Sequence, residues 1–249
     1  RDFCVRLSKY EFFSQKTTVS DKRYGYFDIV AKAACIEIDG IDVGLRFDDL
    51  RAVFDSQQYF SEDSKTAKKL INAIKLLDDS IKQKDERIRN RSLVQSLITL
   101  STKIVEKGNY KSITKKYGDF INEFTDSLAE QVELGNNGTD SSLLEFQKTI
   151  SANTKAGPRI RQNILLNRLL QFSPQFVKFF DSMDILESGI NSSIKSVSKN
   201  VCELIEEINN EYSSIKGKDL FKMTNKSSSA LLKICELITD IKTLEEYID

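Results

Sequence analysis

The sequence predicts a mainly helical α+β protein, in which a small antiparallel β-hairpin or meander at the N-terminus precedes a multi-helix body. Two observations support this fold class. In parts of the first sixty residues, apolar and polar side chains alternate, which is the period of a β-strand. From Asp48 onward, apolar side chains recur every three or four residues, which is the period of an α-helix.

The β element is predicted from two short segments. In residues 3–7, apolar and polar side chains alternate, which predicts a strand. Residues 33–47 contain Asp39-Gly40, a dipeptide that suits a two-residue hairpin turn because both turn positions need positive φ. The hairpin would place Glu37 directly opposite Asp42, so that one face would carry like charges.

Helices are predicted from the apolar period and from residues that are typical of helix ends. A short helix is expected from Asp48, and further helical stretches are expected over residues 61–107, 110–134, 140–154 and 158–172. Residues 82–92, KQKDERIRNRS, are almost wholly charged. They form either a solvated bridge within one long helix or a break between two helices, and the sequence leaves both open.

A regular apolar pattern near the C-terminus predicts a coiled-coil-like segment. Apolar side chains recur at alternating intervals of four and three at Ile190, Ile194, Val197, Val201, Leu204 and Ile208. Residues 227–229 are serines that can cap a final helix. We expect these two helices to fold back on each other as a long antiparallel hairpin.

The change of period suggests two parts. Residues 1–60 are expected to form the small β-containing element and residues 61–249 the helical body, with a sub-boundary at 135–140 or 155–158. The chain begins with Arg1, and its last helical pattern has no terminating Gly or Pro. We therefore expect it to be a fragment of a longer protein.

The 249 residues include no histidine, which excludes several enzyme classes. Ser-His-Asp and Cys-His catalysis and His-containing zinc sites all need that side chain. Neither of the nucleotide-binding motifs GxxxxGK[ST] and GxGxxG is present. The composition therefore argues against an enzyme, and no cofactor is expected.

Cysteine usage and hydropathy favour a cytoplasmic protein. Cys4, Cys35, Cys202 and Cys235 are scattered and form no CxxC pair, so we expect reduced thiols. No apolar run approaches the ~18 residues that are needed to cross a bilayer. The first residues lack the apolar segment of a signal peptide, and we expect no association with a membrane.

Charge is unevenly distributed, although the formal net charge is zero. Residues 65–116 carry fourteen Lys and Arg against five Asp and Glu, whereas residues 180–249 carry eight against thirteen. A basic stripe can neutralise phosphates, with salt-dependent and largely sequence-independent binding, or it can be a solvated helix face. The candidate residues of this stripe are Lys82, Lys84, Arg87, Arg89 and Arg91.

Three arginines form a second set of candidate partner-binding or phosphate-binding residues. Arg159, Arg161 and Arg168 belong to the helix predicted to start at Gly157-Pro158. The first two occupy its first turn, where the helix dipole disfavours cations. They could hold a phosphate or an acidic partner. Alternatively, they pair with carboxylates of a neighbouring helix, because most other side chains of this helix are apolar.

Three acidic residues of the predicted hairpin are candidates for a metal site. Glu37, Asp39 and Asp42 could bind Mg²⁺, since hard cations prefer carboxylate oxygen, and nuclease chemistry could follow. The usual nuclease pattern of an acid followed by Glu-x-Lys is not matched, however. Charges on an exposed sheet face also deter edge-to-edge aggregation, so we expect no metal here.

These observations favour a non-catalytic helical protein-interaction or structural subunit of a larger assembly, whose basic and acidic regions meet partners of opposite sign. The expected partner is another protein or a second copy of the chain. A first alternative is a nucleic-acid-binding component of a DNA-processing or anti-phage system that uses the basic stripe. A second alternative is a metal-dependent nuclease.

Overall fold

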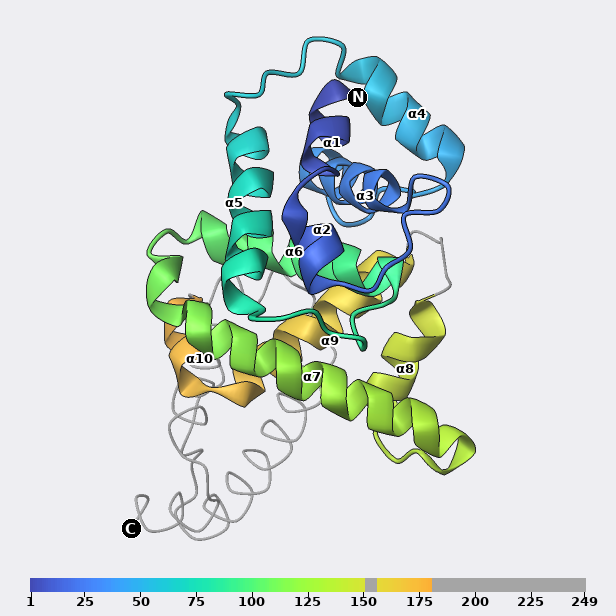
Figure 1. The fold of residues 1–249 in the computed structure, drawn as a ribbon, viewed down its shortest axis with the longest axis vertical. Helices are drawn as coiled ribbons and strands as arrows, with labels where there is room; N and C mark the ends of the chain where they lie inside the picture. The colour runs from blue at the N-terminus through green and yellow to red at the C-terminus, as the bar shows by residue number, and fades with distance from the viewer. Residues whose placement is uncertain (151–155, 181–249) are drawn as a thin grey trace, which may run out of the picture. The chain divides into compact units, whose positions relative to one another are not determined.

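The computed structural model describes residues 1–150 and 156–180, and this part of the chain is built from helices (Figure 1). The first helices are α1 (Asp2–Leu7), α2 (Glu11–Lys16), α3 (Gly25–Asp39), α4 (Phe47–Ser56) and α5 (Lys65–Ser80). They are followed by α6 (Arg91–Glu106), the 3-10 helix η1 (Tyr110–Ile113), α7 (Thr114–Leu134), η2 (Gly135–Asn137), α8 (Ser141–Thr149), α9 (Ala156–Phe172) and α10 (Pro174–Phe179).

Helix α6 is the centre of the core, because it packs against α3, α5 and α9. Its buried apolar side chains are Leu93, Val94, Leu97, Ile98, Leu100 and Ile104. Polar side chains of α6 are buried as well, and they find hydrogen-bond partners within the core. Ser96 Oγ donates to Ser92 O at 2.8 Å, and Ser101 Oγ shares a hydrogen bond of 2.9 Å with the hydroxyl of Tyr117 on α7.

The predicted N-terminal β element is wrong. Residues 2–7 form α1 and residues 25–39 form α3, so Glu37 and Asp42 do not face each other across a ladder. Helix α3 is buried over most of its circumference, at Ile29, Val30, Ala31, Ala33, Ala34, Cys35 and Ile36. A helix that is covered on most sides has a nearly continuous apolar run, and periodicity alone cannot distinguish such a run from a buried strand.

The Asp39-Gly40 dipeptide ends a helix instead of forming a hairpin turn. Gly40 has φ 90°, and its N–H donates to Ile36 O at 2.9 Å. Glycine adopts positive φ after a helix without a steric penalty, as it does in a two-residue turn. The same two residues therefore suit both structures, and the burial of α3 decides between them.

The mainly helical class is confirmed, and within residues 61–150 and 156–180 several helices begin at capping side chains. Side chains of Ser64, Asn90, Asp140 and Ser173 accept hydrogen bonds from first-turn N–H groups of α5, α6, α8 and α10. The charged run at residues 82–92 contains a break between two helices, since α5 ends at Ser80 and α6 begins at Arg91. The helix that was expected to reach residue 154 ends at Thr149.

Some predictions fall beyond the described ranges. The coiled-coil-like pattern from Ile190 to Ile208 and the final helix after residues 227–229 lie outside the described residues. The division into two parts near residue 60 stays a prediction. In the described part of the chain, no helix is long and apolar enough to span a membrane.

Candidate partner-binding surface

Two loops that are far apart in the sequence lie side by side and form the candidate site. Residues 16–24 run from the last residue of α2 to the start of α3, and residues 81–91 run from the end of α5 to the first residue of α6. We call these two segments the paired loops. They run in parallel, with an isolated β-bridge between Thr17 and Asp85.

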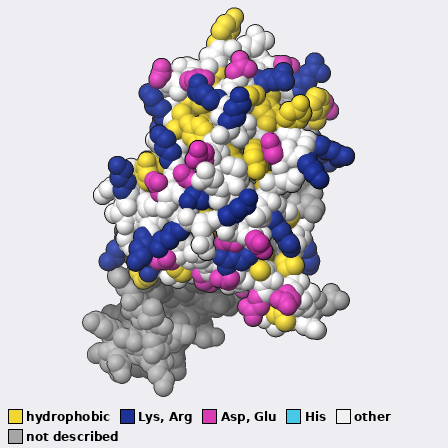
Figure 2. Space-filling model, in the orientation of Figure 1, with side chains coloured by type: hydrophobic (Ala, Val, Ile, Leu, Met, Phe, Trp, Pro, Cys, Tyr) yellow, Lys and Arg dark blue, Asp and Glu magenta, His cyan; other side chains and the backbone are white. Residues whose placement is uncertain are grey.

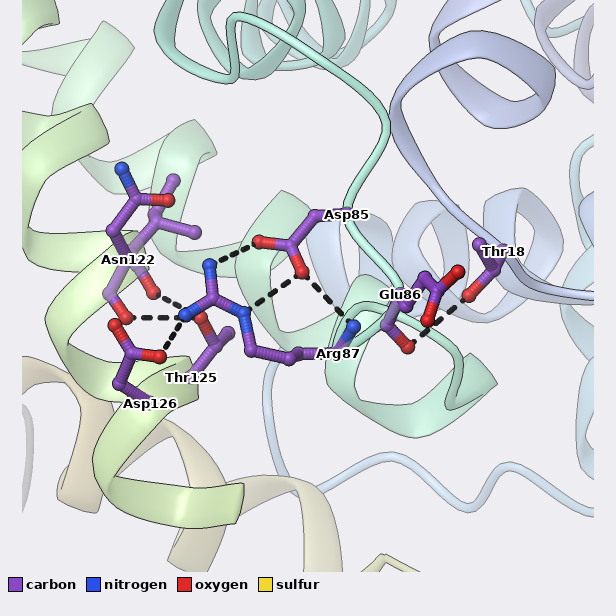
Figure 3. Close-up of polar contacts among 8 residues, drawn as sticks. Thr18, Asp85, Glu86, Arg87, Asn122, Thr125 and Asp126 are labelled. Carbon is purple, nitrogen blue, oxygen red and sulfur yellow. Dashed lines mark hydrogen bonds and ion pairs between the residues drawn. The ribbon is translucent and has the colours of Figure 1, made fainter. Parts of the chain in front are cut away.

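Hydrogen bonds join the paired loops along several residues. Asp85 N–H donates to Lys16 O at 3.2 Å, and Thr18 N–H donates to Ile88 O at 3.1 Å. The hydroxyl of Thr18 also donates to Glu86 O at 3.3 Å, a contact that is drawn in Figure 3. Because backbone groups of both loops are satisfied by each other, the two segments hold a fixed position relative to one another.

Arg87 fastens the second of the paired loops to α7 (Figure 3). Its Nε donates to Asp85 Oδ1 at 2.8 Å and its Nη2 donates to Asp85 Oδ2 at 2.6 Å, while its Nη1 forms an ion pair with Asp126. The side-chain hydrogen bonds with Arg87 lower the pKa of Asp85 and raise the pKa of Arg87 itself. Arg87 therefore uses its donors within the protein, in a bidentate pair with Asp85.

Arg91, the first residue of α6, holds the first of the paired loops in place through hydrogen bonds to its backbone. Its Nη2 donates to Lys22 O at 2.6 Å and lies near Ser20 O at 3.4 Å. A Cβ atom at Gly25 would lie 2.3 Å from Ser20 O and 2.8 Å from Arg91 Nη2, so only glycine fits there. The guanidinium of Arg91 thus positions the loop and is not directed at solvent.

Five cationic side chains of the paired loops are exposed: Lys22, Arg23, Lys82, Lys84 and Arg89. None of them forms an ion pair with any residue in the described ranges. The acidic residues of the same loops are Asp21, Asp85 and Glu86, and the charge of Asp85 is already balanced by Arg87. The exposed surface of the paired loops is therefore cationic. In Figure 2, Lys and Arg side chains lie across the face that is shown, with acidic side chains between them.

Clefts adjoin the paired loops where they meet α7. One cleft of about 690 Å³ lies between residues 81–87 and the first half of α7. Its cationic lining residues are Lys82, Lys84, Arg87, Lys111 and Lys115, and its acidic ones are Asp79, Asp85, Glu86 and Asp119. A second cleft, of about 610 Å³, shares Glu86 and Arg87 with the first and includes Arg89, Glu133 and apolar residues of α7. Lys111 of η1 and Lys115 of α7 thus add cations beyond the loops.

Arg161 is buried and takes part in the core. Its side chain is 2 % exposed, its Nε donates to Ser96 Oγ at 3.0 Å, and its Nη2 donates to Gln95 Oε1 at 3.2 Å. Its Nη1 donates to the carbonyl of Thr149, which is the last residue of α8 and carries the partial negative charge of a helix end. Burial lowers the pKa of Arg161 to about 10. Among the described residues, no carboxylate pairs with it.

The other two arginines of α9 form ion pairs. Arg168 pairs with Asp140 and also donates to Ser142 Oγ at 2.8 Å. Burial opposes ionisation of Asp140, but the hydrogen bonds that it accepts from Arg168 and from the first turn of α8 lower its pKa to about 2. Arg159 Nη1 lies 3.3 Å from Asp42 Oδ1, and both side chains are largely exposed. Pairing with carboxylates is therefore present for Arg159 and Arg168.

The three acidic metal candidates are held apart by other contacts. Glu37 pairs with Lys69 of α5, whose Nζ also lies 3.2 Å from Glu106 of α6. Asp42 pairs with Arg159, and the structure does not bring Asp39 together with either. Within residues 1–150 and 156–180, no group of three or more Cys, Asp or Glu side chains is placed to hold a metal ion.

The sequence did not indicate the contribution of the first loop. Lys22, Arg23 and Tyr24 are not among the candidate residues that the sequence predicts. The only signal in the sequence for a binding surface here was the basic pair Lys22-Arg23, which is followed by Tyr24 and by Gly25 at the start of α3. Their place beside residues 81–91 depends on contacts between segments about seventy positions apart, such as Arg91 to Lys22 with a separation of 69.

Comparisons with models of known protein families, with curated proteins and with solved structures found no match.

Proposed function

We propose that this chain is a non-catalytic helical subunit that binds an acidic partner through the paired loops. One observation carries the proposal: the loops present Lys22, Arg23, Lys82, Lys84 and Arg89 to solvent without ion pairs in the described part of the chain. Unpaired surface cations raise the rate of association with partners of opposite charge and make binding depend on salt.

The contrast with the neighbouring arginines supports this proposal. Arg87 uses its donors on the carboxylates of Asp85 and Asp126, and Arg91 uses its donors on backbone oxygens of the first loop. The exposed cations are therefore attached to a surface whose position is set before a partner arrives, which reduces the ordering cost of binding. Such a division between positioning arginines and outward-facing cations is what a preformed binding surface requires.

The lowered pKa values of Asp85 and Asp140 are typical of structural ion pairs and not of catalytic acids or bases. The pKa of Asp85 is lowered by its hydrogen bonds from Arg87, and the pKa of Asp140 lies at about 2. Both carboxylates stay ionised near neutral pH, so neither is suited to general acid–base catalysis there. The pKa shift of Asp85 arises mainly from hydrogen bonds with Arg87 of the same loop, and hydrogen bonds that include one from Arg168 of α9 lower the pKa of Asp140; both are structural ion pairs.

Retention on a heparin column tests the proposal, because heparin is a polyanion without a base or a specific sequence. We expect the full chain to bind at about 50 mM salt and to elute at moderate salt, as cation–polyanion contacts do. The triple variant Lys82→Glu, Lys84→Glu and Arg89→Glu is expected to lose retention.

A matched variant separates the paired loops from net charge. Lys9→Glu, Lys75→Glu and Lys178→Glu change the charge by the same amount at exposed positions outside the paired loops. This variant is expected to elute close to the parent. Equal losses in both variants, or no retention of the parent at low salt, would contradict the proposal.

A further inference from the structure

An exposed aromatic side chain accompanies the cations of the paired loops. Tyr24 is 81 % exposed and follows Lys22 and Arg23 directly in the first loop. Its ring makes no aromatic contact within the described residues, whereas Tyr26, two positions later, stacks on Phe13. Tyr24 therefore exposes a large apolar face beside a group of cations.

The backbone that carries Tyr24 is tied down on both sides. Tyr26 N–H donates to Asp21 Oδ1 at 2.9 Å, and Asp28 N–H donates to Tyr24 O at 2.9 Å. On the other side, Arg91 donates to Lys22 O at 2.6 Å. The backbone of Tyr24 consequently has a defined position relative to Arg91 and the second loop, and its ring extends from that backbone into solvent.

The cations are spread along the length of the loops. At one end Lys16 Nζ lies 3.1 Å from Lys82 O, and at the other end Arg91 contacts Lys22. The first loop covers six residues between these contacts, from residue 17 to residue 22, whose backbone can span at most about 20 Å. The cations are thus placed along a track that can contact a few nucleotides of an extended strand. Asp21 and Glu86 reduce the positive charge locally, since neither carboxylate forms an ion pair in the described part of the chain.

A cationic track with an exposed ring fits one class of acidic partner better than the others. Proteins that bind single-stranded nucleic acid without a sequence preference place cations along the backbone and aromatic rings under the bases. A duplex keeps its bases stacked inside, so an exposed tyrosine would add little to its binding. An acidic peptide would use the cations but has no base to stack on the ring.

We propose that the paired loops bind single-stranded nucleic acid, with Lys22, Arg23, Lys82, Lys84 and Arg89 along the phosphates and the Tyr24 ring stacked on a base. This inference rests on the proposed function, because it names the acidic partner of the same surface. The mechanism is binding alone and involves no bond breaking. DNA and RNA strands both carry the phosphates and bases that this surface would contact, and the experiment compares the two.

Fluorescence anisotropy with labelled oligonucleotides tests the inference on the full chain. The probes are a mixed-sequence 20-nucleotide strand as DNA and as RNA, and the same DNA sequence as a duplex, all at about 50 mM salt. We expect at least one single strand to bind about tenfold more tightly than the duplex. Tyr24→Ala is expected to weaken single-strand binding about tenfold, as removal of one stacking ring typically does.

Two further variants show whether stacking is responsible. Tyr24→Phe keeps the ring and is expected to bind within about twofold of the parent. Tyr59→Ala removes a ring that is 97 % exposed and lies outside the paired loops, and it is expected to change nothing. Circular dichroism of each variant should match the parent, because both tyrosine side chains project into solvent.

Several outcomes would overturn the inference, and one pattern separates it from the proposed function. Equal affinity for duplex and single strand, or unchanged binding by Tyr24→Ala, would overturn it. Salt-dependent retention on heparin, together with binding of polyglutamate as tight as that of the oligonucleotides, would leave the proposed function intact and refute the nucleic-acid partner. Failure to bind heparin would refute both.

Discussion

Arginine side chains in this protein show why residue type alone does not identify a binding site. The guanidinium carries five N–H donors, which suit a phosphate and internal carbonyl or carboxylate acceptors equally well. Arg87 uses its donors on Asp85 and Asp126, and Arg161 uses its donors inside the core. The sequence predicted these residues as partner-binding candidates, but their surroundings depend on contacts from other helices.

The role of Arg161 can be tested by removing its side-chain donors. Arg161→Met leaves the acceptors on Ser96, Gln95 and the end of α8 without partners in a buried site. We expect the free energy of unfolding to fall by on the order of 3 kcal/mol, measured by urea denaturation.

Arg159→Met is the matched control on the same helix. Its ion pair with Asp42 is exposed, and exposed pairs contribute at most about 1 kcal/mol. Similar losses in the two variants would contradict the structural role that we assign to Arg161.

At the scale of elements, the helix ends were predictable because their chemistry is local. Side chains such as Ser64 and Asp140 cap helices that begin at the next residue, and no distant contact is needed to define them. The identity of α3 was not predictable in the same way. Its apolar run around Ala33 and Ala34 suits a buried strand or a buried helix, and only packing against α1, α4 and α6 separates these two structures.

The packing of α7 against the end of α5 depends on one glycine. A Cβ atom at Gly118 would lie 2.3 Å from Ser80 O, which is a backbone atom and cannot rotate away. Alanine usually stabilises an exposed helix position relative to glycine by about 1 kcal/mol. At this position we expect the opposite sign, with Gly118→Ala lowering the free energy of unfolding by about 2 kcal/mol in urea denaturation.

A second substitution on α7 provides the comparison. Asn122 is exposed one turn later, and Asn122→Ala is expected to leave stability unchanged or to raise it by a few tenths of a kcal/mol. Stabilisation by Gly118→Ala would show that α7 does not approach α5 as closely as described.

At the scale of the whole molecule, the candidate surface was predicted in part. The basic run was visible from composition, and Lys82, Lys84 and Arg89 are indeed exposed. The contribution of Lys22 and Arg23 was not visible, because a pairing between loops about seventy residues apart leaves no period or motif in the sequence. A chain with zero formal net charge can thus gather cations locally through its fold.

Hydrogen–deuterium exchange of the full chain, with and without heparin, tests the central claim most directly because it locates the bound surface. We predict slower exchange of backbone amides in residues 16–24 and 81–91 when heparin is bound. Protection that leaves both paired loops unchanged and appears elsewhere, or no protection at all, would contradict the account.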